Sequence, residues 1–209
     1  MKVFSYLIVI FLIPTLILAN FQFLFINQNF YRSEFARLNV YDQFVAKEQV
    51  DRQIESLVNY LCCNGQLDHQ FYTQREILHL VDVKHLIRLA QIQLFLILAL
   101  LSIITFLLIR KKKIELLIFS YRWGSIAAII SIFILWLSSN LNFDKIFLDF
   151  HYLAFRNDLW LLPQQSNLIK LFPQDFFRDF ANQIAYQTLI MAIVIFIITF
   201  LVKKQKLQH

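Results

Sequence analysis

Glycine and cysteine are nearly absent from this 209-residue chain, which contains two of each. With Gly65 and Gly124 as its glycines, the sequence has no Gly-rich phosphate-binding loop and no Gly-x-Ser-x-Gly nucleophile elbow. The zinc-protease pattern His-Glu-x-x-His is also missing. Cys62 and Cys63 are adjacent and could join only in a strained ring, so we interpret them as the end of a partly buried helix. These absences exclude the enzyme classes that such motifs define.

Charged residues are absent from four long apolar runs, at residues 3–26, 89–109, 123–143 and 182–202. Each run meets the roughly 20 helical residues that a bilayer core requires, and a continuous apolar run is not the alternating pattern of a barrel strand. The chain is 58% hydrophobic and contains 23 Phe, more apolar surface than a water-soluble core of this size would bury. The sequence therefore predicts an all-α integral membrane protein with four transmembrane helices in one membrane domain, 1–209.

Basic residues outside these runs gather at alternate ends of the spans. They are Lys2, the cluster Arg110 to Lys113 with Arg122, and Lys203, Lys204 and Lys206. The two other connections, 27–88 and 144–181, contain more acidic than basic residues. The positive-inside rule therefore predicts that both termini are cytoplasmic and that these two segments are extracytoplasmic. The net charge of +6 is explained by topology, so we predict no nucleic-acid partner.

The first outer segment is too long for a simple connector. Apolar residues from Val50 to Leu61 recur at helical spacing, which predicts an amphipathic helix on the membrane or over the bundle. Thr73-Gln74-Arg75-Glu76 has the pattern of a capping box, and no helix breaker follows it before residue 110. We therefore predict one helix from about Gln74 to Ile109. In the second outer segment, Pro173 is placed to open the helix of the fourth span.

Two histidines lie in these outer segments, near acidic side chains. On the predicted helix, Glu76, His79 and Asp82 are three residues apart and share an arc of about 120°. His151 lies in the second outer segment. Because an imidazole has a pKa near 6.5, two of them suit acid and base roles at neutral pH. The spacing is equally consistent with histidines that only hydrogen-bond headgroups or backbone at the membrane surface.

A zinc site made by His79, His85, His151 and a carboxylate is a weaker alternative. His85 is six residues beyond His79 and points well away from it on a helix, so we predict no metal site. His69 is interpreted as a solvated loop residue, and no role is assigned to His209.

The outer segments resemble the lipoprotein intramolecular transacylase family of bacterial membrane enzymes. The resemblance rests on Phe71-Tyr72-Thr73-x-Arg75-Glu76-x-x-His79-Leu80-x-Asp82-Val83-Lys84, Phe150-His151, Asn157-Asp158-x-Trp160, Leu168-Ile169-x-Leu171-Phe172-Pro173-x-x-Phe176-Phe177 and Tyr31-x-x-Glu34-Phe35. It implies four spans with an outer cap, in a bacterial cell membrane, with the active site on the extracytoplasmic side.

The resemblance also implies a reaction. Its substrate is a lipoprotein whose N-terminal cysteine carries a diacylglyceryl thioether, and the sn-2 acyl chain moves to the cysteine α-amine. The product is a lyso-form lipoprotein. The implied partners are diacylglyceryl-modified lipoproteins and membrane lipid, and no cofactor is implied. His79 and His151 are then the expected catalytic pair. Either could be the base and the other the acid, with a slight preference for His151 as the base. The expected supporting or substrate-binding residues are Arg75, Glu76, Asp82, Lys84, Tyr31, Asn157, Asp158 and Trp160.

Two other functions remain open from the residues themselves. One is a non-catalytic membrane protein whose outer cap binds peptide or lipid. The other is an acyl hydrolase that uses the same imidazoles with water. Ionisable groups clustered at membrane depth argue against the first.

Overall fold

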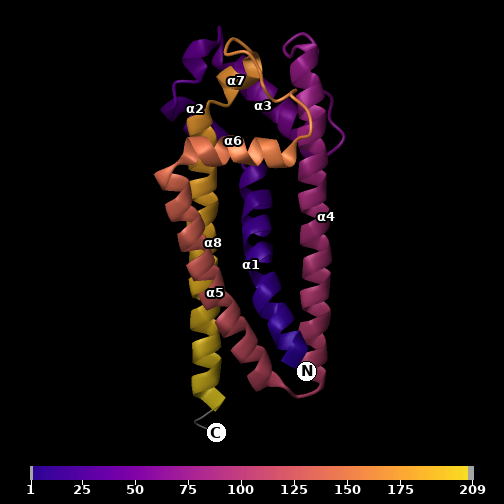
Figure 1. Ribbon diagram of the computed structural model, residues 1–209, viewed down its shortest axis with the longest axis vertical. Helices are drawn as coiled ribbons and strands as arrows, with labels where there is room; N and C mark the ends of the chain where they lie inside the picture. Colours follow the sequence, from indigo (N-terminus) through magenta and orange to yellow (C-terminus); the bar gives the residue numbers. More distant parts are fainter. Residues whose placement is uncertain (1, 207–209) are drawn as a thin grey trace. The chain divides into compact units, whose positions relative to one another are not determined.

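The computed structural model describes residues 2–206, and the regular elements in that range are helices (Figure 1). They are α1 (Lys2–Phe25), α2 (Gln28–Arg37), the 3-10 turn η1 (Tyr41–Gln43), α3 (Lys47–Cys62), α4 (Gln74–Arg110), α5 (Ile114–Leu141), α6 (Phe143–Ala154), α7 (Asn167–Leu171) and α8 (Gln174–Lys206). The predicted all-α fold is confirmed. His209 and the side chains of Lys203, Lys204 and Lys206 lie outside the described part of the chain.

Four helices are long and apolar enough to cross a membrane: α1, α4, α5 and α8. This confirms the four predicted transmembrane helices. The helix that contains the third span begins before residue 123, because α5 starts at Ile114 and includes Arg122. The guanidinium is accommodated there because its Nη2 donates a hydrogen bond to the carbonyl of Thr199 at 2.9 Å.

Helix α4 is longer than a membrane crossing needs. Its 37 residues correspond to about 55 Å, against a hydrocarbon thickness of about 30 Å. The charge-free part, 89–109, matches that thickness, whereas Arg75, Asp82 and Arg88 precede it. We therefore assign the crossing to residues 89–109, and the first turns of α4 lie outside it. The predicted helix from about Gln74 to Ile109 is confirmed.

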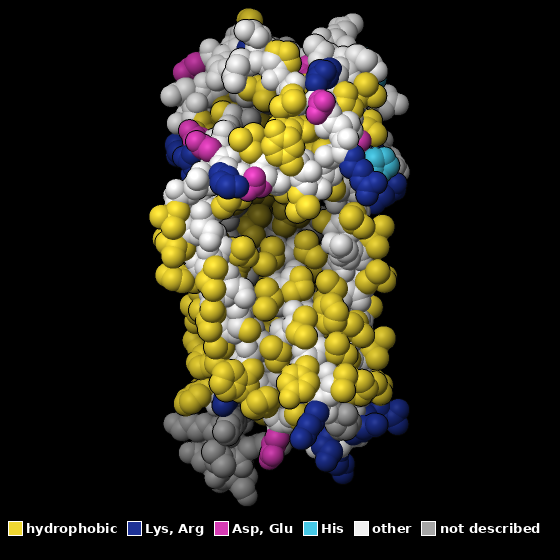
Figure 2. Space-filling model, in the orientation of Figure 1, with side chains coloured by type: hydrophobic (Ala, Val, Ile, Leu, Met, Phe, Trp, Pro, Cys, Tyr) yellow, Lys and Arg dark blue, Asp and Glu magenta, His cyan; other side chains and the backbone are white. Residues whose placement is uncertain are grey.

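The chain divides into two compact units. Unit 1 contains most of α1 and α5 and the later parts of α4 and α8, in residues 2–22, 91–138 and 182–206. Its core joins α1 to the other three helices through Ile8, Leu12, Leu16, Leu101, Ile104, Leu108, Ala128 and Ala192. Gly124 allows close approach of α5 to α1, because a Cβ there would lie 2.9 Å from Leu12 Cδ2. Figure 2 shows hydrophobic side chains over the visible face of these helices, as lipid contact requires.

Unit 2 contains residues 23–90 and 139–181, which include α2, α3, α6 and α7 and the first turns of α4 and α8. Its core is aliphatic under α3 and aromatic where α2 meets the start of α8. The aromatic part stacks Tyr31 on Phe176 at 5.5 Å between ring centroids, with Phe35 and Phe172 at the edges. The amphipathic helix predicted around Val50 to Leu61 is α3, and that apolar face is buried.

The two adjacent cysteines are bonded to each other. A disulfide joins Cys62 to Cys63 at the end of α3, so the ring between adjacent cysteines is formed, at the helix end that the sequence predicted. Gly65 follows closely, and a Cβ there would lie 2.7 Å from the backbone nitrogen of Tyr60. The absence of a side chain at residue 65 therefore lets the chain turn back against α3 directly after the disulfide.

Candidate functional site

His79 lies in the second turn of α4, at a position fixed by the start of that helix. The predicted capping box is confirmed: the Thr73 N–H donates to Glu76 Oε2 at 2.7 Å, and the Glu76 N–H donates to Thr73 Oγ1 at 3.4 Å. The His79 side chain is buried, with 7% exposure, and its Nδ1 has no hydrogen-bond partner among the described residues. Its ring packs edge-on against Phe155 at 5.0 Å.

His151 lies near the end of α6, and its ring orientation is set by the backbone of the same helix. Its Nδ1 is 2.7 Å from the carbonyl oxygen of Phe147, so the Nδ1–H tautomer donates this hydrogen bond. The ring also packs on Phe147 at 4.3 Å and on Trp160 at 4.9 Å. Burial lowers the pKa of His151 below its usual value, and the hydrogen bond to the Phe147 carbonyl opposes that shift in part.

Phe155 joins the two histidines. The phenyl ring is buried and lies 5.0 Å from the His79 ring and 5.6 Å from the His151 ring, between centroids. Two imidazoles from distant parts of the sequence therefore share one apolar contact within unit 2. A neutral imidazole in such surroundings can accept a proton at one nitrogen and donate one at the other.

The loop that follows α6 is held to α4 by polar contacts. Asn157 Nδ2 donates to Asp82 Oδ2 at 2.9 Å, and Arg75 Nη2 donates to the backbone carbonyl of Asp158. The Leu159 N–H donates to Asn157 Oδ1 at 3.0 Å, which tightens the same turn. These contacts position Trp160, which is buried against His151. Five of the sequence-selected residues, Arg75, Asp82, Asn157, Asp158 and Trp160, thus lie beside the histidine pair and shape the loop.

Glu76 is fully buried, and its described hydrogen bonds do not include His79. One oxygen accepts from the Thr73 N–H and hydroxyl, each at 2.7 Å, and the other accepts from the Leu168 N–H at 2.7 Å. The carboxylate therefore caps α4 and ties that helix to the start of α7. The carboxylate thus supports the turn that carries His79.

Lys84 and Tyr31 make their described contacts elsewhere in unit 2. The Lys84 ammonium lies 4.1 Å from the centre of the Tyr60 ring, a cation–π contact between α4 and α3. The Tyr31 hydroxyl donates to the Phe25 carbonyl at 2.8 Å, and burial raises the pKa of that phenol. No described contact joins either side chain to the two histidines.

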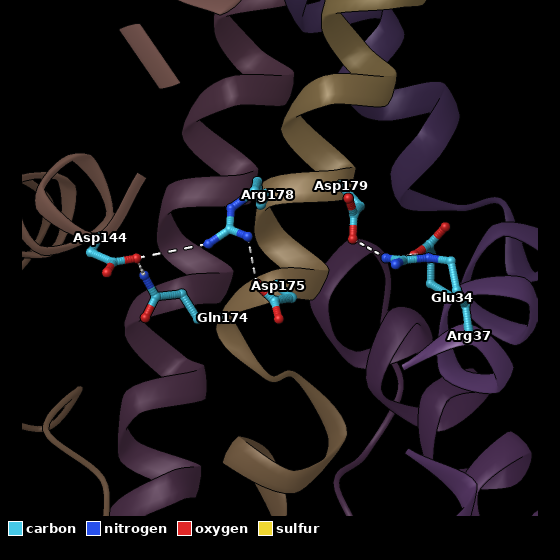
Figure 3. Close-up of polar contacts among 7 residues, drawn as sticks. All are labelled: Glu34, Arg37, Asp144, Gln174, Asp175, Arg178 and Asp179. Carbon is cyan, nitrogen blue, oxygen red and sulfur yellow. Dashed lines mark hydrogen bonds and ion pairs between the residues drawn. The ribbon is translucent and has the colours of Figure 1, made fainter. Parts of the chain in front are cut away.

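Helix α6 is anchored to the first turns of α8 at its N-terminal end (Figure 3). Gln174 Nε2 donates to Asp144 Oδ1 at 2.8 Å, and Arg178 lies 3.8 Å from the same oxygen and 2.8 Å from Asp175. Figure 3 also shows Arg37 between Glu34 and Asp179, which ties α2 to α8. One turn further along α6, Phe147 packs on Phe177 of α8 at 5.4 Å. The helix that carries His151 is therefore fixed to α8.

A cavity in unit 2 lies apart from the histidine pair, and the described residues contain no metal-binding cluster. Within residues 2–206, no group of three or more His, Cys, Asp or Glu side chains is arranged to hold a metal ion. A cavity of about 580 Å³ is lined by Asp42, Gln43, Phe44, Val45, Gln49, Asp68, Gln70, Phe71 and Asn167. Neither histidine is among these lining residues. The described surroundings of the pair are therefore the two rings and their immediate neighbours.

Similarity to known proteins decides the family. The model of the family described as lipoprotein intramolecular transacylase Lit matches residues 6–177, a range that includes both histidines, the first outer segment and residues 144–177 of the second. The chain belongs to this transacylase family. No curated protein matches it in sequence. Family membership makes the chain an acyltransferase, and the family name specifies lipoproteins as the substrate class.

Solved structures of a transacylase of this family share the fold. The in meso structure of the membrane-integral Lit from Bacillus cereus has a TM-score of 0.87 and 24% identity, covering 99% of this chain and 97% of that one. Two further structures of the Bacillus cereus transacylase carry a histidine replaced by arginine (TM-score 0.83, 24% identity) or by alanine (TM-score 0.82, 24% identity). The first covers 100% of this chain and 94% of its own, and the second covers 99% and 95%.

Two neighbours of the histidines in this transacylase were not singled out by the sequence. Phe155 contacts both rings, and Phe147 supplies the carbonyl that orients His151. A backbone carbonyl leaves no mark in the residue type, and one phenyl group does not stand out among 23 Phe. The position of Phe147 four residues before His151 on a helix was the available signal, and it required recognising α6.

Proposed function

We propose that the chain transfers the sn-2 acyl chain of a diacylglyceryl-cysteine lipoprotein to the α-amine of the same cysteine. The product is a lyso-form lipoprotein with an N-acyl, S-monoacylglyceryl cysteine. The observation that carries the proposal is the contact of His79 and His151 with one buried phenyl ring, in a member of this transacylase family. Acid and base catalysis by imidazole is the chemistry that such a pair suits.

His151 acts as the general base in this proposal. Its Nδ1–H donates to the Phe147 carbonyl, which leaves the lone pair of Nε2 available to a proton. Burial lowers the pKa of His151, so the ring is neutral at pH 7. An α-amine has a pKa of about 7.7–8.0 and is mostly protonated at that pH, so removal of its proton is required before it attacks an ester carbonyl.

His79 acts as the hydrogen-bond donor and proton relay. As a neutral ring it presents one N–H, which stabilises the oxyanion that forms when the amine nitrogen attacks the sn-2 carbonyl carbon. Collapse of the tetrahedral intermediate breaks the bond from that carbon to the glycerol oxygen. His151 passes the first proton, taken from the ammonium group, to water. After the attack it takes a second proton from the nitrogen, and this proton reaches the glycerol oxygen, either directly or through His79. One ester and one amine thus become one amide and one alcohol.

The substrate supplies both reacting groups, so no serine or cysteine nucleophile of the chain is needed. The main contribution of the chain is to bring an amine and a carbonyl of one molecule together, which is catalysis by proximity. Loop contacts such as Asp82 with Asn157 and Arg75 with the Asp158 carbonyl support this role, since they hold Trp160 and Phe155 against the histidines. Each step proceeds without a cofactor.

The proposed orientation places unit 2 on the extracytoplasmic side and both termini in the cytoplasm. The distribution of basic residues supports it, because the connection between α4 and α5 contains Lys111, Lys112 and Lys113. Diacylglyceryl lipoproteins and membrane lipid would then meet the histidines from the outer leaflet.

The test is expression of the chain in cells that make only diacylated lipoproteins, followed by mass spectrometry of the N-terminal lipopeptide. We expect an acyl group on nitrogen with the total mass unchanged. Loss of one acyl mass would identify a hydrolase, and an unaltered lipopeptide would identify a non-catalytic binding protein. Either result would refute the proposed transfer. Immunoblots of the membrane fraction control for insertion.

A further inference from the structure

Helix α6 has an apolar stripe that stays partly or largely exposed. Ile146, Phe150 and Leu153 are 38%, 53% and 88% exposed. Their spacing of four and three residues places them on one face of the helix. Figure 2 shows hydrophobic side chains on the face of unit 2 where Figure 1 draws α6. A face of this kind in water would favour association, so its partner must be apolar.

The remaining surface of α6 consists of a buried face, an exposed ion pair, and Leu148 and Tyr152, which are 46% and 69% exposed outside the stripe. Phe143, Phe147 and His151 point into unit 2 and contact α8 or the loop after α6. Lys145 and Asp149 form an exposed ion pair at 2.6 Å, next to the apolar stripe around the helix. Three faces with buried, apolar and charged character are the pattern of a helix at a boundary between protein, lipid and water.

The chain itself fixes where α6 begins. The candidate span α5 ends at Leu141, and Asn142 alone separates it from α6. The Asn142 side chain accepts a hydrogen bond from the Lys145 N–H at 3.2 Å, which caps the new helix immediately. Within unit 2, Figure 1 draws α6 crossing the direction of the first turns of α8. The first turn of α6 therefore follows directly on a candidate membrane span in the chain, and within unit 2 the helix lies across the first turns of α8.

We propose that α6 is an interfacial helix whose stripe of Ile146, Phe150 and Leu153 lies among the lipids of the adjoining leaflet. The occupant is the bilayer itself, because the stripe follows closely in the chain on Leu141, the 77% exposed last residue of the candidate membrane span α5. Such helices insert their apolar face about 5–10 Å into the boundary between headgroups and acyl chains.

Insertion of this stripe has a consequence for the histidine on the same helix. The ester groups of a glyceryl lipid lie at the boundary that the stripe enters, so α6 holds His151 at the depth of the bond to be broken. This consequence rests on the proposed function. The contact of the stripe with lipid is independent of the proposed function.

Spin labels test the contact directly. Single cysteines replace Leu153 on the stripe or Leu148, a 46% exposed leucine of the same helix outside the stripe, in a Cys62→Ser, Cys63→Ser background. Each variant is labelled and reconstituted into phosphatidylglycerol and phosphatidylethanolamine vesicles. Collision rates are then measured with oxygen, which partitions into lipid, and with an aqueous nickel complex. We expect a higher oxygen-to-nickel ratio at 153 than at 148.

Two results would overturn the contact. Equal ratios at the two positions would place the stripe in water. Low collision rates with both reagents at 153 would indicate a protein partner, such as a second copy of this chain, in place of lipid.

A matched pair of charge substitutions tests the catalytic consequence. Leu153→Glu is expected to reduce kcat/KM in vesicles by about tenfold, because a charge on the stripe raises α6 out of the interface. Leu148→Glu should retain activity within about twofold. Equal activity of the two variants, with the label at 153 in lipid, would reject the link to catalysis and leave the interfacial helix. Absence of acyl transfer by the unsubstituted protein would instead reject the proposed function. The spin-label evidence for contact with lipid would remain valid.

Discussion

At the scale of single residues, the two histidines differ in what holds each ring. His151 is oriented by a hydrogen bond to the Phe147 carbonyl, whereas the Nδ1 of His79 has no described partner. A ring with a fixed tautomer suits a base, because the free nitrogen is defined before substrate binds. A ring held mainly by packing can change its donor atom as the reaction proceeds. The fixed tautomer of His151 therefore supports the proposal that this histidine is the base.

Replacement of either histidine should remove most of the activity. We expect His151→Gln and His79→Gln each to lower kcat about 10²–10⁴-fold, because each removes one partner of a proton-transfer step. His69→Gln is the matched control, since His69 is exposed and has no assigned role. Initial rates on a synthetic diacylglyceryl lipopeptide measure the effect. Full activity in either substituted enzyme would contradict the paired assignment.

The pH profile of kcat should reflect the lowered pKa of His151. The neutral form of a base with a lowered pKa persists below pH 6.5, so kcat should stay high at pH 6.5 and fall only in more acidic buffer. Ionisation of the substrate amine produces a separate change near pH 8, which should remain in His151→Gln. An acidic limb of the wild-type profile centred at or above pH 6.5 would show that the base is not held in this environment.

At the scale of helices, the sequence predicted those elements whose signals are long or chemically specific. The capping box of Thr73 and Glu76 and the charge-free run before residue 110 defined α4. Helix α6 was not predicted, because it is short, carries apolar side chains on two faces and follows α5 after Asn142 alone. The predicted span 123–143 includes only its first residue, Phe143. The contact of His151 with Phe147 could not be predicted either, since both residues lie on that helix.

Glu76 should matter for stability more than for the chemical step. Glu76→Ala leaves the Thr73 and Leu168 N–H groups without their buried acceptor, so we expect a loss of about 2–4 kcal/mol in the free energy of unfolding. Thr73→Ala should cost about 1 kcal/mol, as for a typical N-cap. Denaturant unfolding in detergent micelles measures both. An unfolding midpoint for Glu76→Ala equal to that of the wild type would show that these hydrogen bonds do not hold α7 to α4.

At the scale of the whole molecule, hydropathy and charge predict the spans and their orientation, while the histidine site depends on tertiary contacts. His79 and His151 are brought together by Phe155 and by contacts of α4 with the loop after α6. These contacts join residues far apart in the sequence, and spacing alone does not reveal them. The pairing of the two histidines is predicted by the resemblance to the family.

The orientation can be measured with cysteines placed at the two ends of the spans. In a background without Cys62 and Cys63, a membrane-impermeant maleimide should label Gln164→Cys in intact cells. Lys111→Cys, in the connection between α4 and α5, should be labelled only after permeabilisation, because the basic cluster is expected inside. The reverse pattern would place the histidines on the cytoplasmic side and remove the proposed access to exported lipoproteins.

The most direct measurement follows one acyl chain through the reaction. The purified protein in lipid nanodiscs receives a diacylglyceryl lipopeptide with different chains at sn-1 and sn-2, mixed with a heavy-isotope copy. Tandem mass spectrometry should find the sn-2 chain on nitrogen, at unchanged total mass and without exchange between light and heavy molecules. His79→Gln and His151→Gln should leave the lipopeptide as supplied. Release of the chain to water, transfer from sn-1, or mixing of isotopes would contradict an intramolecular transfer guided by the two histidines.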